Sequence, residues 1–361
     1  MDTRADVIIV GGGIIGCAIA DALCKQSLRV RIIDAGDGVP AATHSAAGML
    51  APSAEFDNAD TAPTAISTMG MASLSAWPHV AERLHDQTGI DPDFRPYGTL
   101  SLSPSGNRKV GASEACEQTG AYPALNLDGF DTALLGHEAQ IDPILTLRAL
   151  RKLLRKVETC HWTMARVTDI AAATDTSAIV QIETGERYEA GAVILASGVG
   201  LTRIKTPFSF PPIVPVKGVA LALEHALSPR FPVVRCGEIY LCPRTDGRLI
   251  IGASEERGQE SLTIDRRTID DLRRRATAIL PALADAPEHH RWAGVRPGTP
   301  DHNPHLGHSG HVPRSILFAV GHYRNGILLA PQTAAIITDQ LCATEPGPIP
   351  AAFAPHRAYP A

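Results

Sequence analysis

The sequence predicts an α/β fold in which two domains alternate along the chain. An apolar strand, a glycine-rich turn and a helical pattern follow one another near the N-terminus. The middle of the chain is rich in short strand patterns, and an apolar strand followed by a helix returns near the C-terminus. Because strand-rich segments lie between segments of nucleotide-binding type, we expect a Rossmann-like domain interleaved with a domain built on a mainly antiparallel sheet.

The first elements form a βαβ unit. Residues 5–10 are apolar and β-branched, and they lead into the glycine-rich turn. Residues 17–25 keep apolar side chains at helical spacing, and residues 30–34 form a second apolar run that ends on an acidic residue. A strand, a tight turn, a helix and a second strand in this order predict two parallel neighbouring strands.

Later elements are recognised by apolar runs bounded by Gly and Pro. Helices are predicted over residues 71–87, 144–157, 268–280 and 326–341. Strands are predicted over residues 98–102, 180–184, 192–196, 218–223, 239–242, 249–251 and 316–320. Residues 36–63 are rich in Ala, Ser, Gly and Pro, which indicates a binding segment dominated by its backbone.

The turn after the first strand has the spacing of a dinucleotide site. Gly11 permits the tight turn, Gly13 lets the backbone approach a pyrophosphate, and Gly16 lets the helix pack closely on the strand. The helix N-terminus at Ile14 and Ile15 offers unpaired N–H groups to phosphates. Asp34, at the end of the second strand, is placed to accept hydrogen bonds from ribose hydroxyls.

The fingerprint alone does not separate FAD from NAD, because both cofactors contain the ADP half. A nicotinamide enzyme would complete a second mononucleotide half, whereas this chain continues into a segment of small residues. We expect that segment to lie against a long extended cofactor; a surface loop is the alternative. Its expected cofactor contacts are Ser45, Ala46, Ala47, Gly48 and Met49.

Several stretches resemble the FAD-dependent glycine oxidases of thiamine biosynthesis, within the D-amino-acid oxidase and sarcosine oxidase group. The matching stretches are residues 7–16, 46–50, 215–218, 239–244, 248–253, 292–299 and 321–331. The resemblance implies noncovalent FAD and oxidation of glycine by O2 to the imine and hydrogen peroxide. It also implies cofactor contacts at Val167, Ser197, Gly198, Gly326, Ile327 and Leu328.

The resemblance also implies the residues around the substrate. The arginine matching Arg296 binds the substrate carboxylate in that family, and Tyr240 and Arg324 match residues beside the flavin. Glu255 departs from the family, whose members have an apolar residue there, and it therefore leaves the substrate open among glycine, sarcosine and a small D-amino acid. A solvent-facing Glu255 is the alternative.

The residues themselves fit this chemistry. A planar guanidinium such as Arg296 binds a carboxylate through two parallel hydrogen bonds, although a surface salt bridge is an alternative role. Tyr240 is expected to orient the substrate through its hydroxyl, or else to be a core tyrosine. The helix beginning at Arg324 to Gly326 offers N–H groups where negative charge develops on a flavin, or is an ordinary helix start.

The resemblance also implies where the two domains lie. We place the FAD-binding domain in residues 1–88, 141–212 and 294–361, and the substrate domain in residues 89–140 and 213–293. The alternatives are an FAD-dependent D-amino acid or sarcosine dehydrogenase with another electron acceptor, a flavin-binding module without catalysis, and a nicotinamide enzyme. We expect a small amino acid and O2 as reactants.

Composition excludes other classes of function. A formal net charge of −5 provides no basic field for nucleic acid. No apolar stretch approaches the roughly 18 residues of a membrane span, so we expect a cytoplasmic protein with no membrane partner. Seven cysteines without a C-x-x-C pair, and histidines at 302, 305, 308 and 311 in a Gly- and Pro-containing loop, do not predict a metal site. A homo-oligomer is compatible with the sequence.

Overall fold

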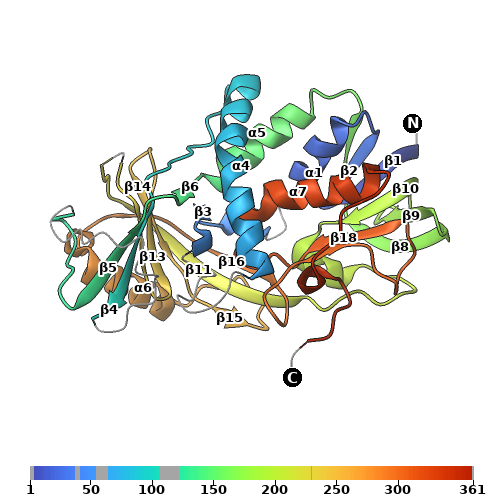
Figure 1. The fold of residues 1–361 in the computed structure, drawn as a ribbon. Coiled ribbons are helices and arrows are strands. Elements are labelled where there is room, and N and C mark those ends of the chain that lie inside the picture. Colours follow the sequence, from blue (N-terminus) through green and yellow to red (C-terminus); the bar gives the residue numbers. More distant parts are fainter. Residues whose placement is uncertain (1–3, 37–40, 54–63, 106–121, 229, 360–361) are drawn as a thin grey trace.

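Two sheets lie side by side in this protein, with a group of helices over the junction between them (Figure 1). The structure is a computed structural model, and it describes residues 4–36, 41–53, 64–105, 122–228 and 230–359. Residues 37–40 and 54–63 of the predicted binding segment lie outside the described residues, as does Cys116.

The first sheet contains the predicted βαβ unit. Its main path runs in the order β17-β18-β10-β1-β2-β7, and β1, β2, β7, β10 and β18 are mutually parallel. The bounds are β1 Arg4–Val10, β2 Val30–Asp34, β7 Cys160–Met164, β10 Arg187–Leu195, β17 His305–Gly307 and β18 Ile316–Val320, with β8 Val167–Thr174 and β9 Ser177–Ile182 joined through β10. The continuous apolar runs of β1 and β18 are buried because both faces of the sheet are covered.

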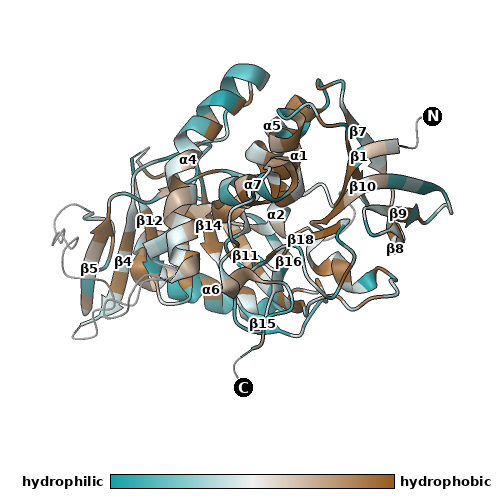
Figure 2. Cartoon of the chain, turned by 45° about the vertical axis from the view of Figure 1, so that its right-hand side comes forward, coloured by the Kyte–Doolittle hydropathy of each residue, from teal (hydrophilic) through white to brown (hydrophobic). Residues whose placement is uncertain are grey.

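Four helices share the core on one face of this sheet. They are α1 Ile14–Cys24, α4 Ala65–Thr88, α5 Pro143–Leu154 and α7 Gly326–Cys342. Their apolar sides pack against strand residues such as Ile9, Ile32 and Ile194, which are fully buried. Figure 2 colours much of α1 and α7 as apolar. A separate core lies under β8 and β9.

The second sheet is mainly antiparallel, with one parallel pair, β12 and β4. Its path is β15-β11-β14-β13-β12-β4-β5, and β16 pairs with β11. The bounds are β4 Thr99–Pro104, β5 Phe130–Leu135, β11 Val214–Glu224, β12 Val233–Cys236, β13 Ile239–Pro243, β14 Arg248–Gly252, β15 Glu256–Arg257 and β16 Glu288–Gly298. Helix α6, Arg266–Ile279, buries its apolar side against this sheet.

Small elements complete the described chain. They are α2 Ala42–Ser45, the two-stranded pair β3 Met49–Leu50 and β6 Ala139–Gln140, and three 3-10 turns at Gly198–Arg203, Pro281–Leu283 and Ala351–Phe353. Met49 of the predicted cofactor segment is therefore held by pairing with Gln140.

The α/β prediction is confirmed, and the differences concern boundaries. The helix predicted from residue 71 begins at Ala65, because the Thr64 hydroxyl accepts a hydrogen bond from Ser67 N–H and caps it. The strand β16 runs through the predicted domain boundary at 293/294, so Arg296 belongs to the second sheet. The division into domains otherwise stays a prediction.

Candidate active site at the junction of the two sheets

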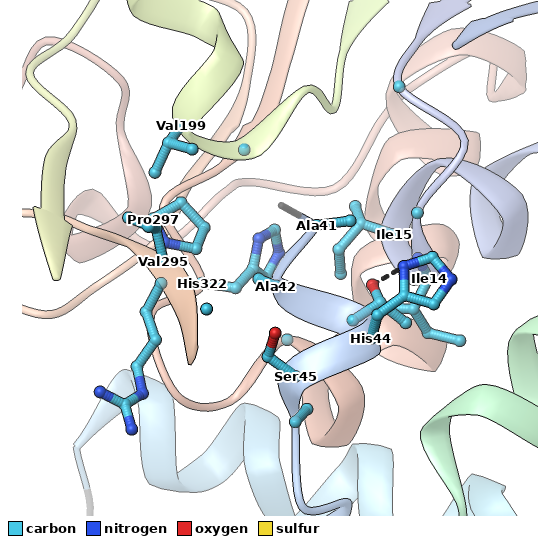
Figure 3. A pocket seen from close by; sticks show the side chains of 18 of the residues that line it. Ile14, Ile15, Ala41, Ala42, His44, Ser45, Val199, Val295, Pro297 and His322 are labelled. Atoms are coloured by element: carbon cyan, nitrogen blue, oxygen red, sulfur yellow. Dashed lines mark hydrogen bonds between the residues drawn. The ribbon is translucent and has the colours of Figure 1, made fainter. Parts of the chain in front are cut away.

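A single cavity joins the turn after β1 to the exposed face of the second sheet. It is lined by α2 from one side and by the loop after β10 and the end of β16 from the other. Figure 3 shows this arrangement, with Ala42 and Ser45 across the cavity from Val199 and Pro297. A ligand in this space therefore touches both sheets.

The turn at the start of α1 is shaped for a phosphate group. Gly11 has φ +108°, which favours glycine, and a Cβ there would come within 2.8 Å of the Ala196 carbonyl carbon. Gly13 caps α1 without a side-chain hydrogen bond. Ile14 N–H donates to the Thr43 hydroxyl at 3.1 Å, and Ile15 also lines the cavity. The helix N-terminus thus faces the cavity with its partial positive charge.

Asp34 lies at the end of β2 and lines the same cavity. Its two carboxylate oxygens accept backbone N–H groups, Oδ2 from Gly12 at 2.6 Å and Oδ1 from Gly36 at 2.9 Å. Arg151 of α5 approaches Oδ1 at 3.8 Å and donates to the Gly12 carbonyl at 3.0 Å. Asp34 therefore organises the turn, and each of its oxygens keeps lone pairs for a further donor.

A second helix N-terminus reaches the cavity from the last strand of the first sheet. Helix α7 begins at Gly326, and its N-cap Asn325 makes no side-chain cap. Gly326 and Ile327 line the cavity, so the positive end of α7 points into it. His322, four residues before Gly326, is buried, and its Nε2 lies 2.9 Å from the Thr333 hydroxyl. Burial lowers the pKa of His322 to about 3, so the ring is neutral near pH 7.

Arg296 projects from β16 onto the second sheet. Its Nη1 donates to the carbonyl oxygens of Ser254 at 3.2 Å and Lys217 at 3.5 Å. The guanidinium lies against Gly218 of β11, where a Cβ would come within 2.5 Å of Nη1. Only a residue without a side chain leaves room for it there.

Tyr240 lies on the same sheet, in β13. Its ring lies over Gly252 of β14, where a Cβ would come within 2.5 Å of the ring Cζ. The residue is buried, and burial raises the pKa of its hydroxyl while Arg296 opposes that shift. Tyr240 therefore presents a neutral hydroxyl to the cavity.

Arg324 and Glu255 meet at the same cavity. Arg324 Nη1 lies 3.4 Å from Glu238 Oε2 and 3.9 Å from Glu255 Oε2. The neighbouring Tyr323 has a raised pKa because it is buried and because Glu255 accepts its hydrogen bond. Glu255 is thus in the cavity and ion-paired, in contrast to the alternative of a solvent-facing side chain.

Most of the predicted site residues line this one cavity. They are Gly11, Gly13, Ile14, Ile15, Asp34, Ser45, Ala46, Ala47, Gly48, Met49, Val167, Ser197, Gly198, Tyr240, Glu255, Arg296, Arg324, Gly326 and Ile327. Gly16 and Leu328 do not line it. A Cβ at Gly16 would collide with the Gly11 carbonyl oxygen, so its role is helix packing. The Leu328 side chain is buried, and its carbonyl accepts the Trp77 indole N–H at 3.0 Å.

The structure adds residues that the sequence analysis did not single out. Arg151 and Thr43 reach the phosphate end from α5 and α2, and no local pattern identifies them. Glu238 stands two positions before Tyr240, and strand alternation places residues two apart on the same face of a sheet. This spacing could have identified Glu238, which lines the cavity together with Tyr240. Tyr323 immediately precedes Arg324.

The histidines at 302, 305, 308 and 311 are used individually. His305 Nε2 lies 3.2 Å from the Pro212 carbonyl oxygen and its Nδ1 lies 2.8 Å from Arg357 Nη1. The His311 ring stacks at an angle on His356. Among the described residues no three His, Cys, Asp or Glu side chains converge in the manner of metal ligands.

Comparison with known proteins identifies the family. The sequence profile described as FAD dependent oxidoreductase matches residues 6–340. The chain belongs to this family of FAD-dependent oxidoreductases. Its cofactor is FAD. The residues of the cavity suit this cofactor, because two helix N-termini, the Asp34 carboxylate and the tight Gly11 turn line one continuous cavity.

Individual relatives of the FAD-dependent oxidoreductase are similar over nearly the whole chain. A bifunctional protein ThiO/ThiG of Synechocystis is 34% identical over 99% of this chain, which spans 54% of that protein. The glycine oxidase of Geobacillus kaustophilus is 31% identical over 94% of this chain and 93% of its own length. A crystal structure of glycine oxidase from the same organism has a TM-score of 0.85 and 27% identity, covering 99% of this chain and 100% of that one.

No helix in the described part of this oxidoreductase combines the length and the apolar character that a bilayer span requires.

Proposed function

We propose that this FAD-dependent oxidoreductase oxidises glycine or another small amino acid with O2, giving an imino acid and hydrogen peroxide, and that it holds FAD noncovalently. The observation that carries the proposal is that Arg296 and Tyr240 line the same cavity as the phosphate-binding turn. The glycine oxidase of Geobacillus kaustophilus, similar over nearly the whole chain, supports a small amino acid as substrate.

The chain's own residues account for orientation. When bound, FAD would supply the redox chemistry: it would accept a hydride from Cα while the amine nitrogen loses a proton, and O2 would then take up the two electrons and two protons as hydrogen peroxide. Arg296 offers two parallel N–H groups to the substrate carboxylate, which fixes both position and direction. The neutral Tyr240 hydroxyl donates or accepts one further hydrogen bond to the bound amino acid. Holding a small amino acid at its carboxylate and at a second point, with its amine neutral, directs its Cα–H into the cavity.

The N-terminus of α7 contributes electrostatically. Its unpaired N–H groups at Gly326 and Ile327 line the cavity and stabilise negative charge that develops there. The buried, neutral His322 adds no positive charge of its own near pH 7. None of the described side chains is assigned here as a base, since an oriented neutral amine does not require one.

The place of the reaction is also part of the proposal. We propose that it serves thiamine biosynthesis, as the sequence resemblance implies. A cytoplasmic location is supported by the six described cysteines, which are all free thiols, as is usual in a reducing compartment.

Three measurements on the purified protein test this function. Oxidised flavin should be visible in the absorbance spectrum, glycine, sarcosine or D-alanine should bleach it without oxygen, and aerobic turnover should release one peroxide per amino acid oxidised. Bleaching without peroxide would favour a dehydrogenase with another acceptor. A protein that takes up FAD but is bleached by none of these amino acids would contradict the proposed substrate class.

A further inference from the structure

The two arginines beside Tyr240 differ in their ionic partners. Arg324 lies between two carboxylates, with Nη1 at 3.4 Å from Glu238 Oε2 and at 3.9 Å from Glu255 Oε2. Glu238 precedes β13 and Glu255 follows β14, so two neighbouring strands of the second sheet bring both carboxylates to Arg324. The Arg324 side chain is 20% exposed, which leaves it only partly solvated.

Arg296 is surrounded differently. Its Nη1 donates to the carbonyl oxygens of Ser254 and Lys217, and within the described residues no carboxylate oxygen lies within ion-pair distance of it. Its charge is therefore available to an incoming anion. The charge of Arg324 is already balanced by protein carboxylates. These carboxylates also make the electrostatic potential around a bound ligand more negative.

We infer that Glu238 and Glu255 restrict this site to amines with a single carboxylate and discriminate against dicarboxylic amines. This inference rests on the proposed function and deepens it. Two arginines and two glutamates carry no net charge together, so a substrate with a neutral amine and one carboxylate on Arg296 makes the group negative by one charge. A second substrate carboxylate then meets Glu255 and Glu238, because Arg324 is the partner it would need and Arg324 is already paired.

The two glutamates contribute unequally. The Glu255 side chain is 31% exposed, whereas that of Glu238 is 62% exposed and more strongly screened by water. The Glu255 carboxylate also raises the pKa of the neighbouring Tyr323 hydroxyl, and both residues line the cavity. We therefore assign the larger part of the discrimination to Glu255.

A pair of ligands that differ only in charge tests the inference. Iminodiacetate and its monoamide, N-(carbamoylmethyl)glycine, have the same shape, but the second carboxylate of the first is a neutral amide in the second. The Kd of each is obtained without oxygen, from its effect on the flavin spectrum or, for a compound that is oxidised, from the concentration dependence of flavin bleaching.

We expect the wild-type protein to bind the monoamide at least about tenfold more tightly than iminodiacetate. The reason is that the second carboxylate of iminodiacetate is repelled by the nearby glutamates in a partly desolvated site, and such repulsion changes Kd by about this factor. Glu255→Gln should reduce the ratio about fivefold or more and Glu238→Gln by less, whereas Glu255→Asp should retain it. Glu288→Gln is the matched control, because Glu288 also pairs with an arginine, Arg291, but does not line the cavity.

Equal binding of the two ligands by the wild-type protein, including the case in which neither binds, overturns the inference. A ratio unchanged in Glu255→Gln, with the protein folded and loaded with flavin, overturns it as well. Failure of the proposed function is seen separately, because glycine, sarcosine and D-alanine would then leave the wild-type flavin oxidised while the two Kd values are still measured.

Discussion

The guanidinium of Arg296 lies directly against Gly218, on the neighbouring strand β11. The absence of a side chain at Gly218 creates the space in which the guanidinium lies, with its Nη1 on the carbonyls of Ser254 and Lys217. The position of a charged side chain thus depends on a neighbouring residue that has no side chain of its own.

Gly218→Ala should displace Arg296 without removing it. A methyl group there would collide with the guanidinium, so we expect KM for glycine to rise at least about tenfold. FAD affinity should stay near that of the wild type, because Gly218 lies on β11 of the second sheet and the phosphate turn follows β1 of the first. Steady-state kinetics and a flavin titration measure the two effects. Gly136→Ala is the matched control, because a Cβ at Gly136 would meet no atom within 4 Å. An unchanged KM would contradict the assigned position of Arg296.

Arg296→Ala should weaken the binding of the amino acid by about 2–5 kcal/mol, the range for loss of one partner of a close charge pair. Arg296→Lys should recover only part of this, because an ammonium does not reproduce the two parallel hydrogen bonds. Arg291→Ala is the control on the same strand, where Arg291 pairs with Glu288 outside the cavity. Steady-state parameters that match the wild type in Arg296→Ala would remove Arg296 from the substrate site.

Asp34→Ala should weaken FAD binding. The Asp34 carboxylate accepts the N–H groups of Gly12 and Gly36, and hydrogen bonds to a charged group contribute about 1.5–3 kcal/mol each. We expect the Kd for FAD, measured by flavin fluorescence, to rise at least about tenfold. Asp6→Ala tests specificity, since Asp6 pairs with Arg29 at the exposed start of β1. The same loss of FAD affinity in both variants would indicate a general loss of stability instead.

Acidification should destabilise the fold through buried neutral histidines. Burial lowers the pKa of His322 to about 3 and that of His305 to about 4, from an ordinary value of 6.5. Below pH 6.5 the unfolded chain therefore binds protons that the folded chain does not, and stability falls as the pH decreases toward 4. For His322 alone the loss between pH 7.5 and pH 5 is about 2 kcal/mol.

Urea unfolding at pH 7.5 and pH 5 measures this loss. His322→Gln keeps a hydrogen-bonding side chain near Thr333 and removes the titrating ring, so the difference between the two pH values should shrink. His289→Gln is the control, because His289 is largely exposed. An equal pH dependence in His322→Gln and the wild type would show that His322 does not titrate as inferred.

Local patterns in the sequence determined the nucleotide-binding unit. The glycines at 11, 13 and 16, the apolar strands around them and Asp34 lie within one βαβ unit, whose geometry depends on neighbours a few residues apart. The predicted parallel pairing and the placement of Asp34 at a strand end are therefore confirmed. The domain boundary predicted at 293/294 falls within β16, and the division into domains stays a prediction.

Only the tertiary structure decided how the cavity is charged. Arg151 meets the phosphate turn from 139 residues away, and Arg324 meets Glu238 from 86 residues away. Such contacts depend on how the two sheets pack, and neither composition nor periodicity encodes that packing. The sequence by itself therefore determined a dinucleotide-binding unit. The packing of β13, β14 and β16 decided that Arg324 meets two carboxylates while Arg296 meets backbone carbonyls, because burial and distance set the ionic partners.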